Sequence, residues 1–247
     1  RSLQLKQFIY ILESHIAYLQ SVWLTVGCTL LNYLHMNIGM IVKARGLKKS
    51  LGIRYAHFVS LSSVDILLTM ISGACMGIIV LIISWNTFGP ERNYTLLFFA
   101  VVLTSALLLF AIPSSWVSKN NWWIINIIRA YLVGVEQIRN KPTDLSILFL
   151  FVTGRLLLIA IQFLICFSAL GMQISFFGCV LFSVVTSLLM IVNITPGSIG
   201  VREVLVGAIA VTTGQGFEVG VLASSLYRAC AVIVHLTIGV PGLIMLR

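Results

Sequence analysis

The sequence predicts an all-α fold, a polytopic membrane helix bundle with two broken or re-entrant helix elements and an internal repeat. The 247 residues are 59% hydrophobic and only 9% charged, whereas a soluble domain carries about 25% charged residues. Several apolar runs reach the length that a membrane-crossing helix needs. The alternating pattern of an outer-membrane barrel is absent from the sequence. We therefore expect a single transmembrane domain over residues 1–247.

The expected membrane segments follow from the apolar runs. They are residues 21–42, 55–85, 95–112, 144–170, 174–192 and 218–246. The first is interrupted between Asn32 and Gly39, and the fifth stops at Asn193. A further run, 201–213, is short for a core of about 30 Å at about 1.5 Å per residue. It forms either a re-entrant half-helix or a thin span.

Two amphipathic segments accompany these spans. Apolar residues at helical spacing across residues 3–20 predict a helix at the membrane interface, or the end of a helix that begins upstream. Residues 114–142 combine three tryptophans with Arg129, Glu136 and Arg139. Tryptophan at the edge of an apolar run is typical of the membrane interface. We expect this second segment to lie on the cytoplasmic surface.

The basic residues set the expected orientation. The net charge is +9, and nine basic residues fall in the two connections 43–54 and 114–142. In the loops 86–94 and 171–173 the only basic residue is Arg92. An excess of Lys and Arg is typical of cytoplasmic loops and suits anionic lipid headgroups. The pattern predicts a multi-pass protein of the cell (cytoplasmic) membrane and argues against nucleic-acid binding.

An earlier segment resembles the break near the end of the chain. Asn32 and Gly39 have the same spacing as Asn193 and Gly200, and each pair follows an apolar run. Secondary transporters are often built from two such repeats with discontinuous helices; chance recurrence of Asn and Gly is the alternative. The repeat halves would be residues 21–85 and 174–246, joined by 86–173. The sequence leaves open whether they run parallel or inverted.

The stretch from Asn193 to Glu203 combines a helix break with two adjacent opposite charges inside an apolar chain. A charge at mid-membrane costs at least about 2.5 kcal/mol, and freed backbone groups need partners. N–H groups at a new helix N-terminus favour anions, and arginine binds phosphate oxygens in pairs. Glu203 either balances Arg202 in the empty state or binds a cationic aminoacyl group, unless the two form an ordinary interfacial pair. The expected lipid-headgroup residues are Gly197, Ser198, Gly200, Arg202, Glu203, Arg228 and Arg155.

Three charged residues lie well inside expected spans, away from the span ends. Arg228 needs an anionic partner or a wet cavity, and Asp65 occupies the comparable place in the other half. We therefore expect an Asp65–Arg228 ion pair, acting as a brace or a gate. Arg155 either meets phosphate in a cavity or extends to the interface. The expected structural or gating residues are Asn193, Pro196, Asp65, Asn32 and Gly39.

The motif Pro196-Gly-Ser-Ile-Gly-Val-Arg-Glu203, with Leu226-Tyr-Arg228 and a glycine-bearing last helix, resembles the transmembrane, flippase-like domain of lysyl-phosphatidylglycerol synthases. The usual form of the first motif in that family is PGGxGxRE, from which Ser198 departs. In the N-terminal half His35 stands where the family has proline. Asp65 resembles an aspartate of the family, but the glutamate–arginine pair that often precedes that aspartate is missing. The resemblance implies a domain that moves a polar lipid between leaflets, such as aminoacylated phosphatidylglycerol or a polyprenyl-linked sugar.

The sequence holds no sign of catalysis. It has no nucleophile-with-base spacing, no Walker A motif and no metal-ligand cluster, and its five scattered cysteines form no CxxC pair. We therefore expect no enzymatic activity, no cofactor and no metal. A translocator of an anionic or lipid-linked substrate is the favoured function. The alternatives are a non-transporting scaffold or regulatory partner of a glycosyltransferase or lipid synthase, and a membrane enzyme acting on a lipid-linked substrate. An oligomer is compatible with each of them.

Overall fold

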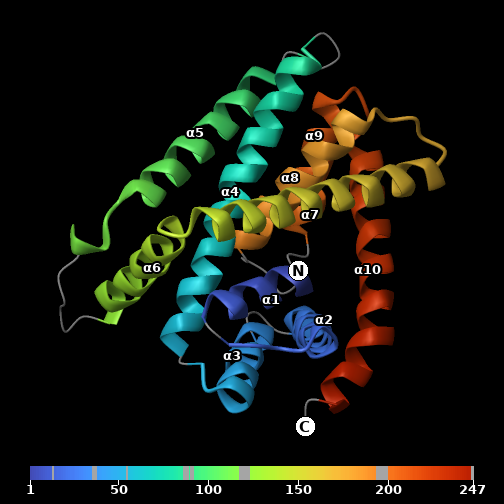
Figure 1. Ribbon diagram of the computed structural model, residues 1–247. Coiled ribbons are helices and arrows are strands. Elements are labelled where there is room, and N and C mark those ends of the chain that lie inside the picture. The colour runs from blue at the N-terminus through green and yellow to red at the C-terminus, as the bar shows by residue number, and fades with distance from the viewer. Residues whose placement is uncertain are drawn as a thin grey trace.

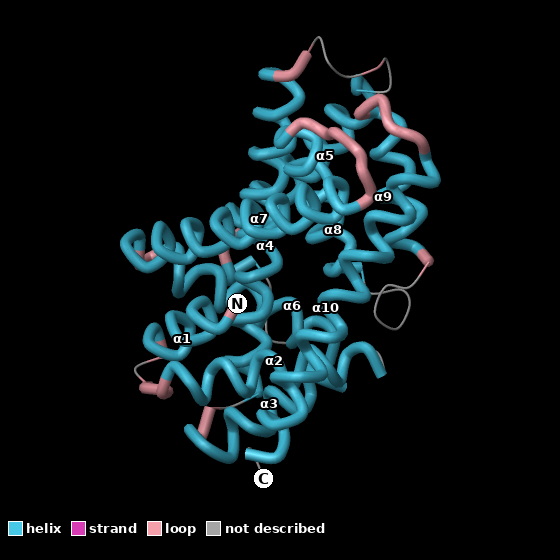
Figure 2. Tube along the Cα trace, turned by 90° about the vertical axis from the view of Figure 1, so that its right-hand side faces the viewer, coloured by secondary structure: helices cyan, strands magenta, loops and turns pink. Residues whose placement is uncertain are grey.

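The computed structural model describes residues 1–12, 14–34, 38–53, 55–85, 89, 92–116, 123–192 and 200–245. Within this part the secondary structure is entirely helical (Figures 1 and 2). The helices are α1 (Ser2–Ile11), α2 (Tyr18–Leu34), α3 (Ile38–Leu51), α4 (Tyr55–Ile83), α5 (Arg92–Ala111), the short 3₁₀ helix η1 (Ser114–Trp116), α6 (Trp123–Arg139), α7 (Pro142–Ala169), α8 (Phe176–Val192), α9 (Val201–Thr212) and α10 (Phe217–Met245). The predicted all-α bundle is confirmed.

Four of these helices are long and apolar enough to cross a membrane. The candidate spans are His57–Ile83, Arg92–Ala111, Pro142–Ala169 and Phe217–Ile244, which belong to α4, α5, α7 and α10. The α8 helix is apolar but shorter. The predicted membrane protein is therefore confirmed, with helix ends within a few residues of the expected apolar runs.

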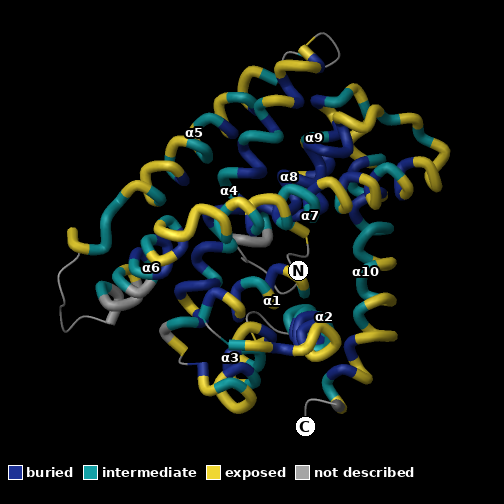
Figure 3. Tube along the Cα trace, in the orientation of Figure 1, coloured by how far each residue is buried: buried dark blue, intermediate teal, exposed yellow. Residues whose placement is uncertain are grey.

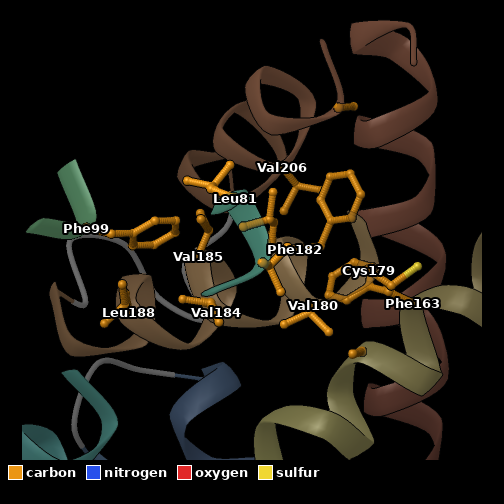
Figure 4. Close-up of a cluster of buried hydrophobic side chains, with 14 of the residues drawn as sticks. Leu81, Phe99, Phe163, Cys179, Val180, Phe182, Val184, Val185, Leu188 and Val206 are labelled. Atoms are coloured by element: carbon orange, nitrogen blue, oxygen red, sulfur yellow. The ribbon is translucent and has the colours of Figure 1, made fainter. Parts of the chain in front are cut away.

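The most buried element is α8. Its side chains from Cys179 to Leu188 are all buried, and the apolar ones form one hydrophobic cluster with residues of α4, α5, α7, α9 and α10 (Figure 4). A mostly apolar helix that is buried on all sides is stable only when other helices surround it. By contrast, α5 and α10 expose much of their surface (Figure 3). Their exposed apolar side chains are suited to contact with lipid.

The α1 helix packs into the bundle and is shorter than the helix expected over residues 3–20, while its place at the membrane interface stays a prediction. Phe8 and Ile11 join a cluster with α4, α6 and α7, whereas Leu5 and Ile9 join a second cluster with α2 and α3. Because apolar residues occupy two faces of α1, the helix is stabilised by contacts on both sides. It ends at Ile11, well before residue 20.

The expected basic loop 43–54 is largely helical, which is a second correction. The α3 helix continues to Leu51, with Lys48 and Lys49 in its last turn, where positive charge is favourable. Ala44 and Leu47 are buried against neighbouring helices, so packing holds this basic segment in a helix. The expected amphipathic helix at 114–142 is present as α6, whose Leu132, Val135 and Ile138 are buried.

The two halves of the chain contain helices of similar length. The α2, α3 and α4 helices have 17, 14 and 29 residues, and α8, α9 and α10 have 17, 12 and 29. The first helix of each set packs against the long helix of the other, α2 on α10 and α8 on α4. These lengths agree with the expected internal repeat, which stays a prediction, as does the re-entrant character of α3 and α9.

Candidate functional site

The predicted site residues divide into described and undescribed positions. Asn193, Pro196, Gly197 and Ser198 lie outside the described residues. The others lie on six helices or at their ends. Gly200, Arg202 and Glu203 are at the start of α9, Arg228 is in α10, Asp65 in α4, Arg155 in α7, Asn32 in α2 and Gly39 in α3.

The start of α9 is shaped by Gly200 and Glu203. Gly200 has a φ of 84°, a left-handed conformation that glycine adopts without strain. Its backbone N–H donates to Glu203 Oε2 at 2.7 Å. A glutamate at the third helical position often caps a helix start in this way. This N–H is therefore already hydrogen-bonded within the protein. It is not one of the donors that the start of α9 could offer to an anion.

Glu203 also pairs with Arg228 of the neighbouring helix. Glu203 Oε1 lies 2.6 Å from Arg228 Nη1, although the two groups lack the alignment of a hydrogen bond. The side chains are only 11% and 23% exposed, respectively. The expected Asp65–Arg228 pair is thus wrong. Because α9 packs directly on α10, the acid nearest to Arg228 comes from α9 rather than from α4.

Arg202 is buried, and no carboxylate among the described residues forms an ion pair with it. It is 5% exposed, and its guanidinium lies over the ring of Tyr227, 4.6 Å from the ring centroid. Tyr227 in turn stacks on Phe163 of α7, with centroids 4.8 Å apart and planes 7° apart. Arg202 Nε has no hydrogen-bond partner, and Arg202 takes part in no ion pair within the described ranges. We call Arg202, Glu203, Tyr227 and Arg228 the C-terminal cluster.

A second polar group surrounds Asp65. Arg155 Nη1 lies 3.5 Å from Asp65 Oδ1, and Arg155 Nη2 donates to Thr69 Oγ1 at 2.7 Å. Gln4 Nε2 donates to Asp65 Oδ1 at 2.5 Å, while Gln4 Oε1 accepts from Arg155 Nη1 at 3.3 Å. We call Gln4, Asp65, Thr69 and Arg155 the N-terminal cluster. Arg155 therefore meets a carboxylate, which was neither of the two expected environments.

Sequence reasoning missed Gln4, Thr69 and Tyr227 as members of these clusters. Thr69 carried a signal, because it lies one helical turn after Asp65 on the same face. Gln4 carried a weaker one, as a polar residue at an otherwise apolar helical position of α1. Tyr227 had none beyond its place in the Leu226-Tyr-Arg228 motif.

Two of the predicted structural residues contact each other. Asn32 Oδ1 accepts a hydrogen bond from the Gly39 N–H at 2.8 Å, so the end of α2 is connected to the start of α3. A Cβ atom on Gly39 would overlap the Cys28 carbonyl oxygen. Glycine is therefore required where the two helices approach.

Further polar residues lie near each cluster. Tyr33 of α2 lies within electrostatic reach of Arg202 and Arg228. Lys43 of α3, outside the candidate spans, lies within reach of Asp65, and burial lowers the pKa of its ammonium. The site thus gathers several cations around two carboxylates, and each carboxylate already has an arginine beside it.

The site has no sign of a metal centre. Among the described residues no group of three or more His, Cys, Asp or Glu side chains could hold a metal ion. The five cysteines, all in described helices, are free thiols. The contacts that the two clusters make are ion pairs, hydrogen bonds and a ring contact.

Comparisons with known proteins agree with the helical membrane architecture. No curated protein sequence and no solved structure matches the chain. A family model, described as the lysylphosphatidylglycerol synthase TM region, matches residues 1–239. Since this match covers nearly all of the chain, including both clusters, the protein belongs to the family of lysylphosphatidylglycerol synthase transmembrane regions.

Proposed function

We propose that this protein binds a lipid with a charged headgroup inside the cell membrane and translocates it between leaflets. Aminoacylated phosphatidylglycerol and polyprenyl-linked sugars are examples of such lipids. The proposal includes no catalytic step, because the clusters consist of fixed charges, hydroxyls and an amide. Family membership supports a role with membrane lipids.

One observation carries the proposal, the burial of Arg202 without a carboxylate in ion-pair contact among the described residues. Arg202 is 5% exposed, and in this part of the chain its Nε has no hydrogen-bond partner. Burying an unpaired charge is strongly unfavourable, and intramembrane ionisable groups generally serve a function. A headgroup phosphate would supply the missing anion, since arginine binds phosphate oxygens through charge-assisted hydrogen bonds.

A second function is favoured by the ion pairs. Both carboxylates of the site already have an arginine beside them, Asp65 with Arg155 and Glu203 with Arg228. Such pairs would suit a packed scaffold that anchors a glycosyltransferase or lipid synthase without moving lipid. Arg202 separates the two functions, because a scaffold gains nothing from a buried cation without a counter-ion.

Leaflet-resolved movement of labelled lipids in liposomes tests the proposal. We compare the wild type with Arg202→Ala and with Arg45→Ala, an exposed arginine of α3 that serves as a matched control. Loss of one charge-assisted phosphate contact predicts movement slower by about tenfold or more in Arg202→Ala, and unchanged movement in Arg45→Ala. Background-level movement for the wild type, with every variant folded, would leave the scaffold function as the better account.

A further inference from the structure

We infer that the headgroup bound by the C-terminal cluster is anionic, a phosphate group that carries no compensating cation. This inference rests on the proposed function and narrows its substrate class. A cationic aminoacyl lipid and an anionic phospholipid both have charged headgroups, but they need opposite partners. The occupancy of the carboxylates distinguishes them.

A cationic headgroup would need a carboxylate that is not already paired with an arginine. Glu203 has both oxygens engaged, Oε2 by the Gly200 N–H at 2.7 Å and Oε1 by Arg228 at 2.6 Å. Asp65 lies beside Arg155 and accepts a hydrogen bond from Gln4. An ammonium group entering the site would therefore meet two carboxylates that arginines already neutralise.

An anionic headgroup would need a cation that no carboxylate neutralises. The C-terminal cluster holds two arginines and one glutamate, so it carries one positive charge in excess. Arg202 is that excess charge, and it is held by the Tyr227 ring rather than by a carboxylate. Because the effective dielectric of such a site is far below that of water, the cluster attracts anions and repels cations more strongly than an exposed site would.

Glu203 would compete with a headgroup phosphate for Arg228. Its Oε1 lies 2.6 Å from Arg228 Nη1. A phosphate oxygen could bind at the same place on the guanidinium. A ligand that reaches Arg228 must displace or share this contact. Replacing Glu203 with glutamine removes the competing charge but keeps an oxygen that can accept the Gly200 N–H. Glu203→Gln is therefore predicted to tighten anion binding.

The experiment measures binding to the full chain in neutral detergent. The probes are short-chain phosphatidic acid, short-chain lysyl-phosphatidylglycerol, short-chain phosphatidylcholine and inorganic phosphate, each followed by a ligand-induced shift of the thermal unfolding midpoint. Phosphatidic acid should bind about tenfold more tightly than the zwitterionic or cationic lipid. Inorganic phosphate at equal concentration should neither match it nor displace it.

Three variants sharpen the test. Arg202→Ala should weaken phosphatidic acid binding about tenfold, and Arg202→Lys should retain part of it, since lysine keeps the charge but not the fork of donors. Glu203→Gln should lower the midpoint without ligand and enlarge the shift that phosphatidic acid produces. Arg45→Ala should behave as the wild type.

Several results would overturn the inference. Lysyl-phosphatidylglycerol binding as tightly as phosphatidic acid, or an unchanged affinity in Arg202→Ala, would contradict an anionic headgroup site. Equal binding of inorganic phosphate would remove the lipid from the assignment. In the liposome assay, movement of the cationic lipid alone would overturn this inference and leave translocation standing. Selective binding of phosphatidic acid without movement would support the inference and overturn only translocation.

Discussion

The two clusters contain the same kinds of groups, and each has an arginine, Arg155 or Arg202, whose Nε lacks a hydrogen-bond partner among the described residues, but they differ in whether every arginine lies beside a carboxylate. In the N-terminal cluster the terminal nitrogens of Arg155 contact Asp65, Thr69 and Gln4. In the C-terminal cluster Arg228 faces one carboxylate, and Arg202 lies on an aromatic ring without an ion pair in the described chain. A satisfied network stabilises a packing arrangement, whereas an unsatisfied cation is suited to a ligand.

Buried charged residues of this domain therefore have different expected roles in the two clusters. The N-terminal cluster joins α1, α4 and α7 through side-chain contacts, and it is best understood as a brace. The C-terminal cluster leaves a cation without an acid among the described residues, and it is the proposed binding site. Four substitutions, in order of decreasing expected effect, can break or sharpen this division.

Phe163→Ala should be the most destabilising change. Phe163 is fully buried and stacks on Tyr227, so its truncation leaves a cavity and removes the support of the Arg202 ring contact. Truncation of a buried phenylalanine costs about 3–5 kcal/mol. The free energy of unfolding in mixed detergent micelles measures the loss. A loss below about 1 kcal/mol would show that the stack contributes little.

Arg228→Ala should follow, because it leaves Glu203 nearly buried and unpaired. Removing one partner of a buried ion pair costs about 3–5 kcal/mol, and we expect the lower end since Arg228 is 23% exposed. The double variant Glu203→Gln with Arg228→Ala should recover part of this loss. If the double variant is no more stable than Arg228→Ala alone, the destabilisation does not come from the unpaired carboxylate.

Gln4→Ala should destabilise the N-terminal cluster by about 1–2 kcal/mol, because Asp65 and Arg155 each lose a hydrogen-bond partner. Lipid binding should stay at the wild-type level, since Gln4 belongs to the brace. Gln7→Ala is a matched control, as Gln7 lies one turn later on α1 and bonds Asp144 instead. A selective loss of lipid binding in Gln4→Ala would place the N-terminal cluster in the binding site.

Tyr227→Phe should have the smallest effect, under about 1 kcal/mol, because it keeps the ring that Arg202 and Phe163 contact and removes only the hydroxyl that interacts with Arg202. Tyr227→Leu should weaken lipid binding more, since it removes the ring. Equal binding by the two variants, measured by titration with phosphatidic acid, would mean that the aromatic ring does not position Arg202.

Much of the fold follows from hydropathy, whereas the pairing within the site does not. The spans α4, α5, α7 and α10 could be predicted because length and apolarity are local properties of the sequence. The partner of Arg228 could not, because the sequence offers both Asp65 and Glu203 as acids, and helix packing decides which one it meets. Gln4 was missed because the burial of α1 depends on contacts with distant helices.

The central claim is that Arg202 binds the ligand and Asp65 braces the fold. Titration of Arg202→Ala and Asp65→Asn with phosphatidic acid, followed by thermal unfolding, tests it most directly. The account predicts that Asp65→Asn unfolds at a lower temperature but keeps the ligand-induced shift, while Arg202→Ala keeps its stability and shows a smaller shift, as about tenfold weaker binding requires. An undiminished shift in Arg202→Ala together with a reduced shift in Asp65→Asn would contradict the account.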